Sequence, residues 1–133
     1  MINNKLTVGI TQGDGNGIGY EVIIKALADA RILDGFTPVI YGSSKIFGFY
    51  RKQIHNLEQL DTYVINSVKD AKVKKINILN CLPDNVYVEP GQATPDSAKS
   101  AITALERAVA DLKSGDIDVL VTGPINKRSM TNA

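Results

Sequence analysis

The amino-acid sequence predicts an α/β fold, with a mostly parallel sheet and helices on both faces. Two observations predict it. Short apolar segments of strand character alternate with longer segments whose apolar residues recur every three or four positions, and this alternation is the pattern of βαβ units. The chain has 133 residues, 44% of them hydrophobic and 22% charged, which is typical of one globular domain.

The chain opens with a predicted strand and a predicted helix. The segment LTVGIT at residues 6–11 has strand character. Apolar residues at helical spacing then predict a helix from Ile18 to Ala30. Gly35 is the expected stop before a second strand over Thr37–Tyr41.

The middle of the chain is harder to interpret. Ser43 or Ser44 can cap a helix whose apolar positions run from residue 46 to residue 57, although Gly48 weakens that helix. Asn, Asp and Pro residues mark turns beyond it. Further strands are predicted at residues 62–65, 76–79 and 86–88.

The strongest helix prediction lies near the end of the chain. Thr94 suits the N-cap, and Pro95 suits the first helical position because its missing N–H would have no partner there. Small and apolar residues repeat at three- and four-residue steps as far as Leu112, and Gly115 suits the C-cap. The last predicted strand is Ile117–Thr122.

A glycine-rich segment, TQGDGNGIGYE at residues 11–21, joins the first strand to the first helix. Such a loop at a helix N-terminus can cradle an anion, or it can be a tight turn without a ligand. Its spacing fits neither the dinucleotide fingerprint G-x-G-x-x-G nor the P-loop. Asp14 would repel a phosphate, so it suits a hydroxyl, an amide or a metal, or it caps neighbouring N–H groups.

Charge and composition exclude some partners. The net charge of +1 gives no reason to expect binding to nucleic acid or to an anionic membrane. No apolar run approaches the roughly 20 residues of a membrane helix, and the first residues do not lead us to expect a signal peptide. Cys81 is expected to be a buried, inert thiol in a reducing cytoplasm, and His55 a surface residue. A solvated face is expected for the lysines at 69, 72, 74 and 75, with a phosphate-binding patch as the alternative.

Two segments resemble a known family. Residues 13–21, GDGNGIGYE, have the length of the G-D-P-x-G-I-G-P-E loop of the 4-hydroxythreonine-4-phosphate dehydrogenases, with Gly15 and Tyr20 in place of its prolines. Residues 118–127, DVLVTGPINK, resemble the D-A-L-V-T-(A/G)-P-I-N-K segment of the same family. Because ligands of open α/β sheets bind beyond the carboxyl ends of strands, both loops are expected to line one crevice.

The resemblance implies a fold like that of isocitrate and isopropylmalate dehydrogenases, with residues 1–133 as the N-terminal part of a two-domain enzyme. The implied reaction is the oxidation and decarboxylation of 4-phosphohydroxy-L-threonine, a small phosphorylated amino acid, to 3-amino-2-oxopropyl phosphate in pyridoxine 5'-phosphate biosynthesis. NAD or NADP and a divalent metal are the implied cofactors, and a cytoplasmic homodimer is the implied assembly. The metal ligands are expected outside this chain, which is expected to be inactive alone.

The resemblance also suggests supporting roles for a few residues. Asp14, Gly17 and Ile18 are expected near the cofactor, and Asn126 and Lys127 near the substrate, where Lys127 would offset phosphate or carboxylate charge. No catalytic residue and no metal ligand is expected within the chain. Two alternatives remain: a stand-alone α/β module that binds a nucleotide or phosphate without catalysis, and a fragment that only associates with a partner chain.

Overall fold

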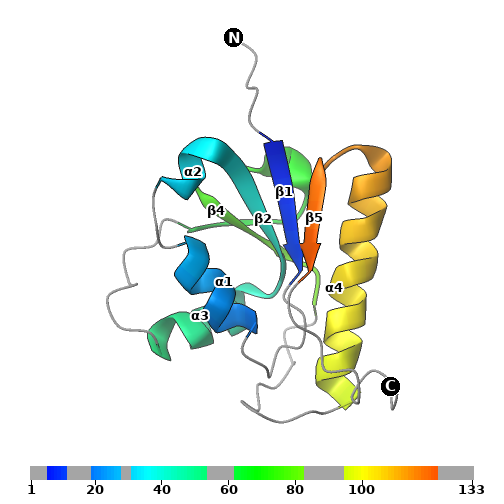
Figure 1. The fold of residues 1–133 in the computed structure, drawn as a ribbon. Coiled ribbons are helices and arrows are strands. Elements are labelled where there is room, and N and C mark those ends of the chain that lie inside the picture. The colour runs from blue at the N-terminus through cyan, green and yellow to red at the C-terminus, as the bar shows by residue number, and fades with distance from the viewer. Residues whose placement is uncertain (1–5, 12–18, 28–30, 54–61, 83–94, 123–133) are drawn as a thin grey trace.

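Five parallel strands form the centre of the protein. In the computed structural model the described residues are 6–11, 19–27, 31–53, 62–82 and 95–122. The sheet has the order β3-β4-β2-β1-β5, and each pair of neighbouring strands is parallel (Figure 1). The strands are β1 Leu6–Thr11, β2 Phe36–Gly42, β3 Thr62–Ile65, β4 Ile76–Asn80 and β5 Val119–Thr122. The predicted fold class is confirmed.

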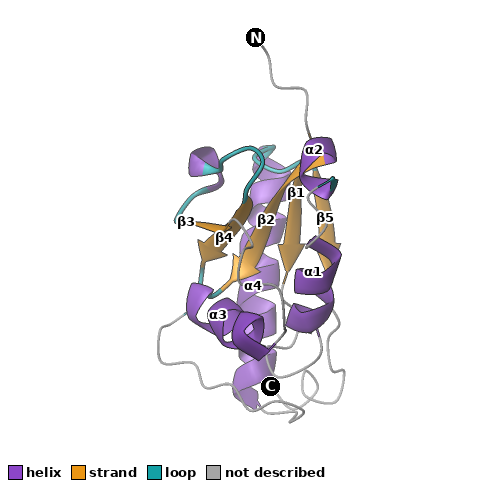
Figure 2. Ribbon diagram, turned by 90° about the vertical axis from the view of Figure 1, so that its left-hand side faces the viewer, coloured by secondary structure: helices purple, strands orange, loops and turns teal. Residues whose placement is uncertain are grey.

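Helices cover both faces of this sheet. The helices are α1 Gly19–Leu27, α2 Ile32–Gly35, α3 Ser44–Gln53 and α4 Pro95–Ser114, and a short 3-10 helix, η1 Val68–Asp70, lies between β3 and β4. Figure 2 shows α1, α2 and α3 in front of the sheet and α4 behind it. None of the described helices is long and apolar enough to cross a membrane.

The alternation of side chains along each strand divides the apolar interior into two cores. Ile40 of β2 packs with the residues of α1 and α3, whereas its neighbours Val39 and Tyr41 pack with those of α4. Residues 37–42 of β2 are all buried, as expected for a central strand of a parallel sheet.

Close packing of α4 on the sheet depends on small residues. The buried apolar residues of α4 are all alanines, Ala101, Ala104 and Ala108. Opposite them, Gly9 of β1 has no space for a side chain, because an added Cβ would lie 2.6 Å from Cδ1 of Ile117. The larger apolar residues of α4 are only half-buried or exposed, which the sequence pattern did not indicate.

Two helix caps match the prediction. The Ser43 side chain accepts hydrogen bonds from the N–H groups of Lys45 (3.2 Å) and Ile46 (3.4 Å), at the start of α3. Gly115 has φ of +85° and donates its N–H to the carbonyl of Leu112, which ends α4.

Some predicted boundaries differ from the structure. The helix predicted over residues 18–30 is described only as far as Leu27, and a separate short helix, α2, ends at Gly35. The last strand begins at Val119 rather than Ile117, because Ile117 turns into the α4-side core and its N–H lies near the Asp111 carbonyl that terminates the helix. Residues 54–57, the predicted strand at 86–88, and Thr94 lie outside the described residues.

Candidate functional site at the carboxyl ends of the parallel strands

The carboxyl ends of β1 and β5 lie side by side. The two strands are paired in parallel, and their last residues, Thr11 and Thr122, are register partners. Thr11 is fully buried, whereas Thr122 is exposed at the margin of the sheet. The chain therefore leaves the sheet from two adjacent points on the same edge, which is where α/β proteins bind their ligands.

The residues expected at the site follow these two strands. Asp14, Gly17 and Ile18 come between β1 and α1, and Asn126 and Lys127 come after β5; all five lie outside the described residues. The described structure places their preceding strands next to each other, as the expectation of a shared crevice requires. The side chains themselves are not placed, so their roles stay predictions.

The neighbouring strand ends, those of β2 and β4, are closed by protein groups. The Asn80 side-chain oxygen accepts a hydrogen bond of 2.7 Å from the N–H of Ser44, at the first residue of α3. Cys81 donates its N–H to the carbonyl of Gly42 at 3.0 Å, so the two strands stay joined beyond their ends. Together with the Ser43 cap, these bonds occupy the first amides of α3, which a bound anion would otherwise use.

The side chain of Asn77 links β4 to β2 and to the segment before β4. The fully buried Asn77 of β4 donates its side-chain amide to the carbonyls of Pro38 (3.0 Å), Lys72 (3.0 Å) and Lys75 (3.2 Å). Its side-chain oxygen accepts a hydrogen bond of 2.8 Å from the N–H of Lys72. One amide thus holds the segment before β4 against β2.

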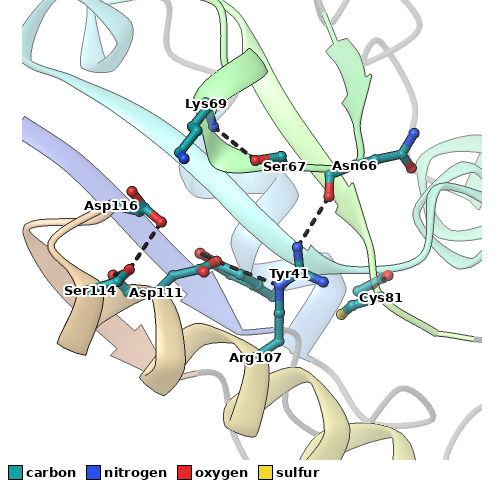
Figure 3. A network of polar contacts seen from close by, with 10 residues as sticks. Tyr41, Asn66, Ser67, Lys69, Cys81, Arg107, Asp111, Ser114 and Asp116 are labelled. Atoms are coloured by element: carbon teal, nitrogen blue, oxygen red, sulfur yellow. Dashed lines mark hydrogen bonds and ion pairs between the residues drawn. The ribbon is translucent and has the colours of Figure 1, made fainter.

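A second polar network joins β2 to α4 (Figure 3). The phenol of Tyr41 donates a 2.6 Å hydrogen bond to Oδ2 of Asp111, and Nε of Arg107 lies 3.8 Å from the same oxygen. Arg107 also donates to the carbonyl of Asn66 at 3.1 Å, just after β3. Burial, with the Asp111 carboxylate beside it, raises the pKa of Tyr41 far above its ordinary value, so the phenol stays protonated.

The single cysteine is not set up as a nucleophile. Burial raises the pKa of Cys81 from 9.0 to about 11, which keeps the thiol protonated at neutral pH. This agrees with the inert thiol expected from the sequence, although Cys81 is half-buried rather than buried. Within the described residues, no group of three or more His, Cys, Asp or Glu side chains could hold a metal ion.

The lysine-rich segment lies away from this edge. Lys69, Lys72 and Lys74 are exposed, in agreement with a solvated face. Lys69 and Lys72 border an open hollow of about 440 Å³ beside β3, together with Asp70, and Nζ of Lys72 lies 5.6 Å from the ring centre of Tyr63.

Sequence reasoning missed the groups that shape the described edge. Asn77 was interpreted only as part of the predicted strand at residues 76–79, and that strand ends before Asn80. The pairing of Tyr41 with Asp111 joins residues 70 positions apart. The one available signal was an asparagine inside an apolar strand, since a buried amide must find hydrogen-bond partners.

The chain is similar to a set of phosphate-substrate dehydrogenases. A family model described as pyridoxal phosphate biosynthetic protein PdxA matches residues 34–133. A 4-hydroxythreonine-4-phosphate dehydrogenase of Bacteroides thetaiotaomicron is 42% identical over 130 residues, which cover 98% of this chain and 35% of that protein. A putative D-threonate 4-phosphate dehydrogenase of Clostridium botulinum is 30% identical, with 98% and 39% covered.

Solved structures show the same similarity in three dimensions. A 4-hydroxythreonine-4-phosphate dehydrogenase from Burkholderia phymatum aligns with a TM-score of 0.85 at 27% identity, over 97% of this chain and 39% of that one. The enzyme of the same name from Klebsiella pneumoniae aligns with a TM-score of 0.83 at 25% identity, over 97% and 40%. The chain therefore spans between a third and two fifths of the length of these relatives.

Proposed function

The chain belongs to the PdxA family of pyridoxal phosphate biosynthetic proteins, and on that premise we propose that it forms the N-terminal part of a 4-hydroxythreonine-4-phosphate dehydrogenase. The proposed reaction is the NAD- or NADP-dependent oxidation and decarboxylation of 4-phosphohydroxy-L-threonine to 3-amino-2-oxopropyl phosphate. The relative with 42% identity carries the name of this activity, which favours it over the D-threonate 4-phosphate activity named for a relative with 30% identity.

One observation carries the proposal: the register pairing of Thr11 with Thr122. The glycine-rich loop leaves the sheet after Thr11, and the Gly-Pro-Ile-Asn-Lys segment leaves it after Thr122. Two loops that start from adjacent strand ends are well placed to contact one ligand. At the neighbouring ends of β2 and β4, protein groups already bond the amide of Ser44 at the start of α3. We therefore expect the ligand at the ends of β1 and β5.

The proposed roles divide between the two loops. The loop with Asp14, Gly17 and Ile18 approaches the nicotinamide cofactor, which supplies the redox chemistry when bound. Asn126 and Lys127 face the substrate, where the ammonium of Lys127 offsets the charge of a phosphate or carboxylate. The proposal includes a divalent metal, but the described residues offer no ligand set for one, so no step is assigned to it.

The alternative is an α/β module that binds a nucleotide or phosphate without catalysis. Calorimetry with NAD on the purified chain, with and without a divalent metal, separates the two readings. Tight, metal-independent binding to the chain alone would favour the module. Absence of such binding agrees with a site that needs further residues.

The substrate is tested in a chimera in which residues 1–133 replace the aligned segment of the Bacteroides thetaiotaomicron relative. Formation of reduced nicotinamide is followed with 4-phosphohydroxy-L-threonine and with D-threonate 4-phosphate, which carry an amine and a hydroxyl at C2 respectively. We expect a higher kcat/KM for 4-phosphohydroxy-L-threonine, the compound with the amine. A folded chimera that prefers D-threonate 4-phosphate, or that uses neither compound, would contradict the proposed function.

A further inference from the structure

The geometry points to a docking surface along β5 and the neighbouring flank of α4, which we call the β5 margin. Its exposed and half-buried apolar residues are Ile102, Leu105, Val109, Leu112, Val119 and Val121. The occupant that we infer is the part of the family chain beyond the segment aligned here, which adds a strand beside β5 and covers both faces of that edge. The inference concerns assembly of the fold and does not require dehydrogenase activity.

The strand β5 is unusually exposed for its position and composition. Its sequence VLVT is apolar apart from one threonine, yet none of its four residues is buried. Val119 is 41% exposed and Val121 is 49% exposed, on the face opposite α4. Strands of parallel sheets are normally covered on both faces, and no described strand pairs with the outer edge of β5.

The flank of α4 next to β5 exposes further apolar side chains on the other face of the sheet. Arg107 and Asp111 reach Asn66 and Tyr41 on the side of the helix toward β3 (Figure 3). At 3.6 residues per turn, the opposite flank carries the apolar residues that belong to neither core cluster: Ile102, Leu105, Val109 and Leu112. Since α4 contacts β1, β2 and β5, this flank overhangs the β5 edge (Figure 1).

The other edge of the sheet differs in charge. The strand β3 also exposes apolar side chains, with Val64 at 50% and Tyr63 at 38%. A lysine-rich segment follows it, and the ammonium of Lys72 lies over the Tyr63 ring. Lysines beside an edge strand discourage pairing with another strand. The strand β5 contains no charged residue, so the two edges are not equivalent as docking surfaces.

The length of the relatives identifies the occupant. The solved dehydrogenase from Burkholderia phymatum contains this fold in only 39% of its chain, so more than half of that polypeptide lies beyond the aligned segment. The margin ends at Thr122, directly beside the candidate site. Polypeptide docked there would bring additional groups next to the ends of β1 and β5.

Cysteine accessibility tests this directly. In a Cys81→Ala background, Val121→Cys and, on the other edge, Val64→Cys are made both in the 133-residue chain and in the full-length chimera described above. Reaction of each cysteine with a maleimide is measured by peptide mass spectrometry. We expect both to react in the chain alone, and only Val121→Cys to slow in the chimera, by roughly tenfold or more, because local opening must precede reaction.

Three results would overturn the inference. One is an equal rate for Val121→Cys in the chain and the chimera. Another is a rate in the chain alone that falls as its concentration rises, because the occupant would then be a second copy. The third is failure of the chimera to fold under conditions in which both parents fold, because the surfaces would not be complementary. A protected but inactive chimera would support the inference while contradicting the proposed function.

Discussion

Thr11 and Thr122 end adjacent parallel strands in register, although they lie at opposite ends of the sequence. Each is followed by a segment that resembles the same dehydrogenase family. Their pairing makes one edge of the sheet the common starting point of both segments. The account of function therefore depends on how firmly β1 is held between β2, β5 and α4.

Gly9→Ala should destabilise the protein. Its Cβ would lie 2.6 Å from Ile117 Cδ1 and 3.0 Å from Tyr41 Cε2, inside the core beneath α4. We expect the free energy of unfolding to fall by about 1–3 kcal/mol, as for other overpacked cores. The matched control is Gly48→Ala in α3, where an added Cβ meets nothing within 4 Å. There we expect a gain of about 0.5–1 kcal/mol, because alanine favours helix. Denaturant unfolding measures both, and equal effects would contradict the packing argument.

Asn77→Ala tests the buried amide of β4. The substitution removes four hydrogen bonds and leaves the N–H and C=O of Lys72 without that partner. We expect a loss of about 2–3 kcal/mol in the free energy of unfolding. In the control Asn66→Ala, the bond from Arg107 goes to the main-chain oxygen and survives, so the change should be small. Similar losses in both variants would show that Asn77 is not the anchor.

Stability should fall at alkaline pH through Tyr41. The folded state holds the phenol proton more tightly than the unfolded chain, whose tyrosine titrates near 10.0. The protonated phenol therefore makes its full contribution to the free energy of unfolding below pH 10. Above pH 10 that contribution decreases by about 1.4 kcal/mol per pH unit. Tyr41→Phe should remove this one-proton component from the pH dependence of the free energy of unfolding. At neutral pH the same variant should lose about 1–2 kcal/mol of stability, because the hydrogen bond to Asp111 is lost.

The half-buried thiol of Cys81 adds a second alkaline component. The pKa of Cys81 rises from 9.0 to about 11 in the folded protein. The contribution of this thiol to the free energy of unfolding therefore begins to fall near pH 9, one pH unit below that of Tyr41. Urea unfolding across this pH range, for the parent, Tyr41→Phe and Cys81→Ala, separates the two components. Identical slopes in the parent and both variants would refute these assignments.

The isolated chain should have no dehydrogenase activity. The described residues contain no cluster that could hold a metal, and the chain spans only 35% of its relative from Bacteroides thetaiotaomicron. We expect no reduced nicotinamide from 4-phosphohydroxy-L-threonine with the chain alone and turnover with the chimera. Turnover by the chain alone would show that its site is complete.

The sequence predicted the elements and their parallel arrangement well, because hydrophobic periodicity and capping residues act locally. Ser43 and Gly115 mark helix ends by their own chemistry, and both do so in the structure. Boundaries were less accurate where tertiary contacts decide them. Ile117 leaves the strand because it fills the space above Gly9, which no local pattern could indicate.

The candidate site was predictable only through the two motif segments. Strand order could not be read from the sequence, so the adjacency of β1 and β5 was an expectation until the pairing of Thr11 and Thr122 was seen. The Asn80 cap on α3 joins two strand ends and depends on the same long-range order. The sequence also did not show that one flank of α4 is exposed, because the apolar residues on that flank have the spacing expected of core positions.

The most direct test of a shared site is a double-mutant cycle on Asp14 and Lys127 in the chimera. We expect Asp14→Asn and Lys127→Ala each to lower kcat/KM by roughly 10²-fold, as misplaced or missing charge does in related cases. Because both loops would act on one bound complex, the double variant should lose much less than the product of the two effects. Fully additive losses, or single variants that retain the parent kcat/KM, would contradict a common site at the ends of β1 and β5.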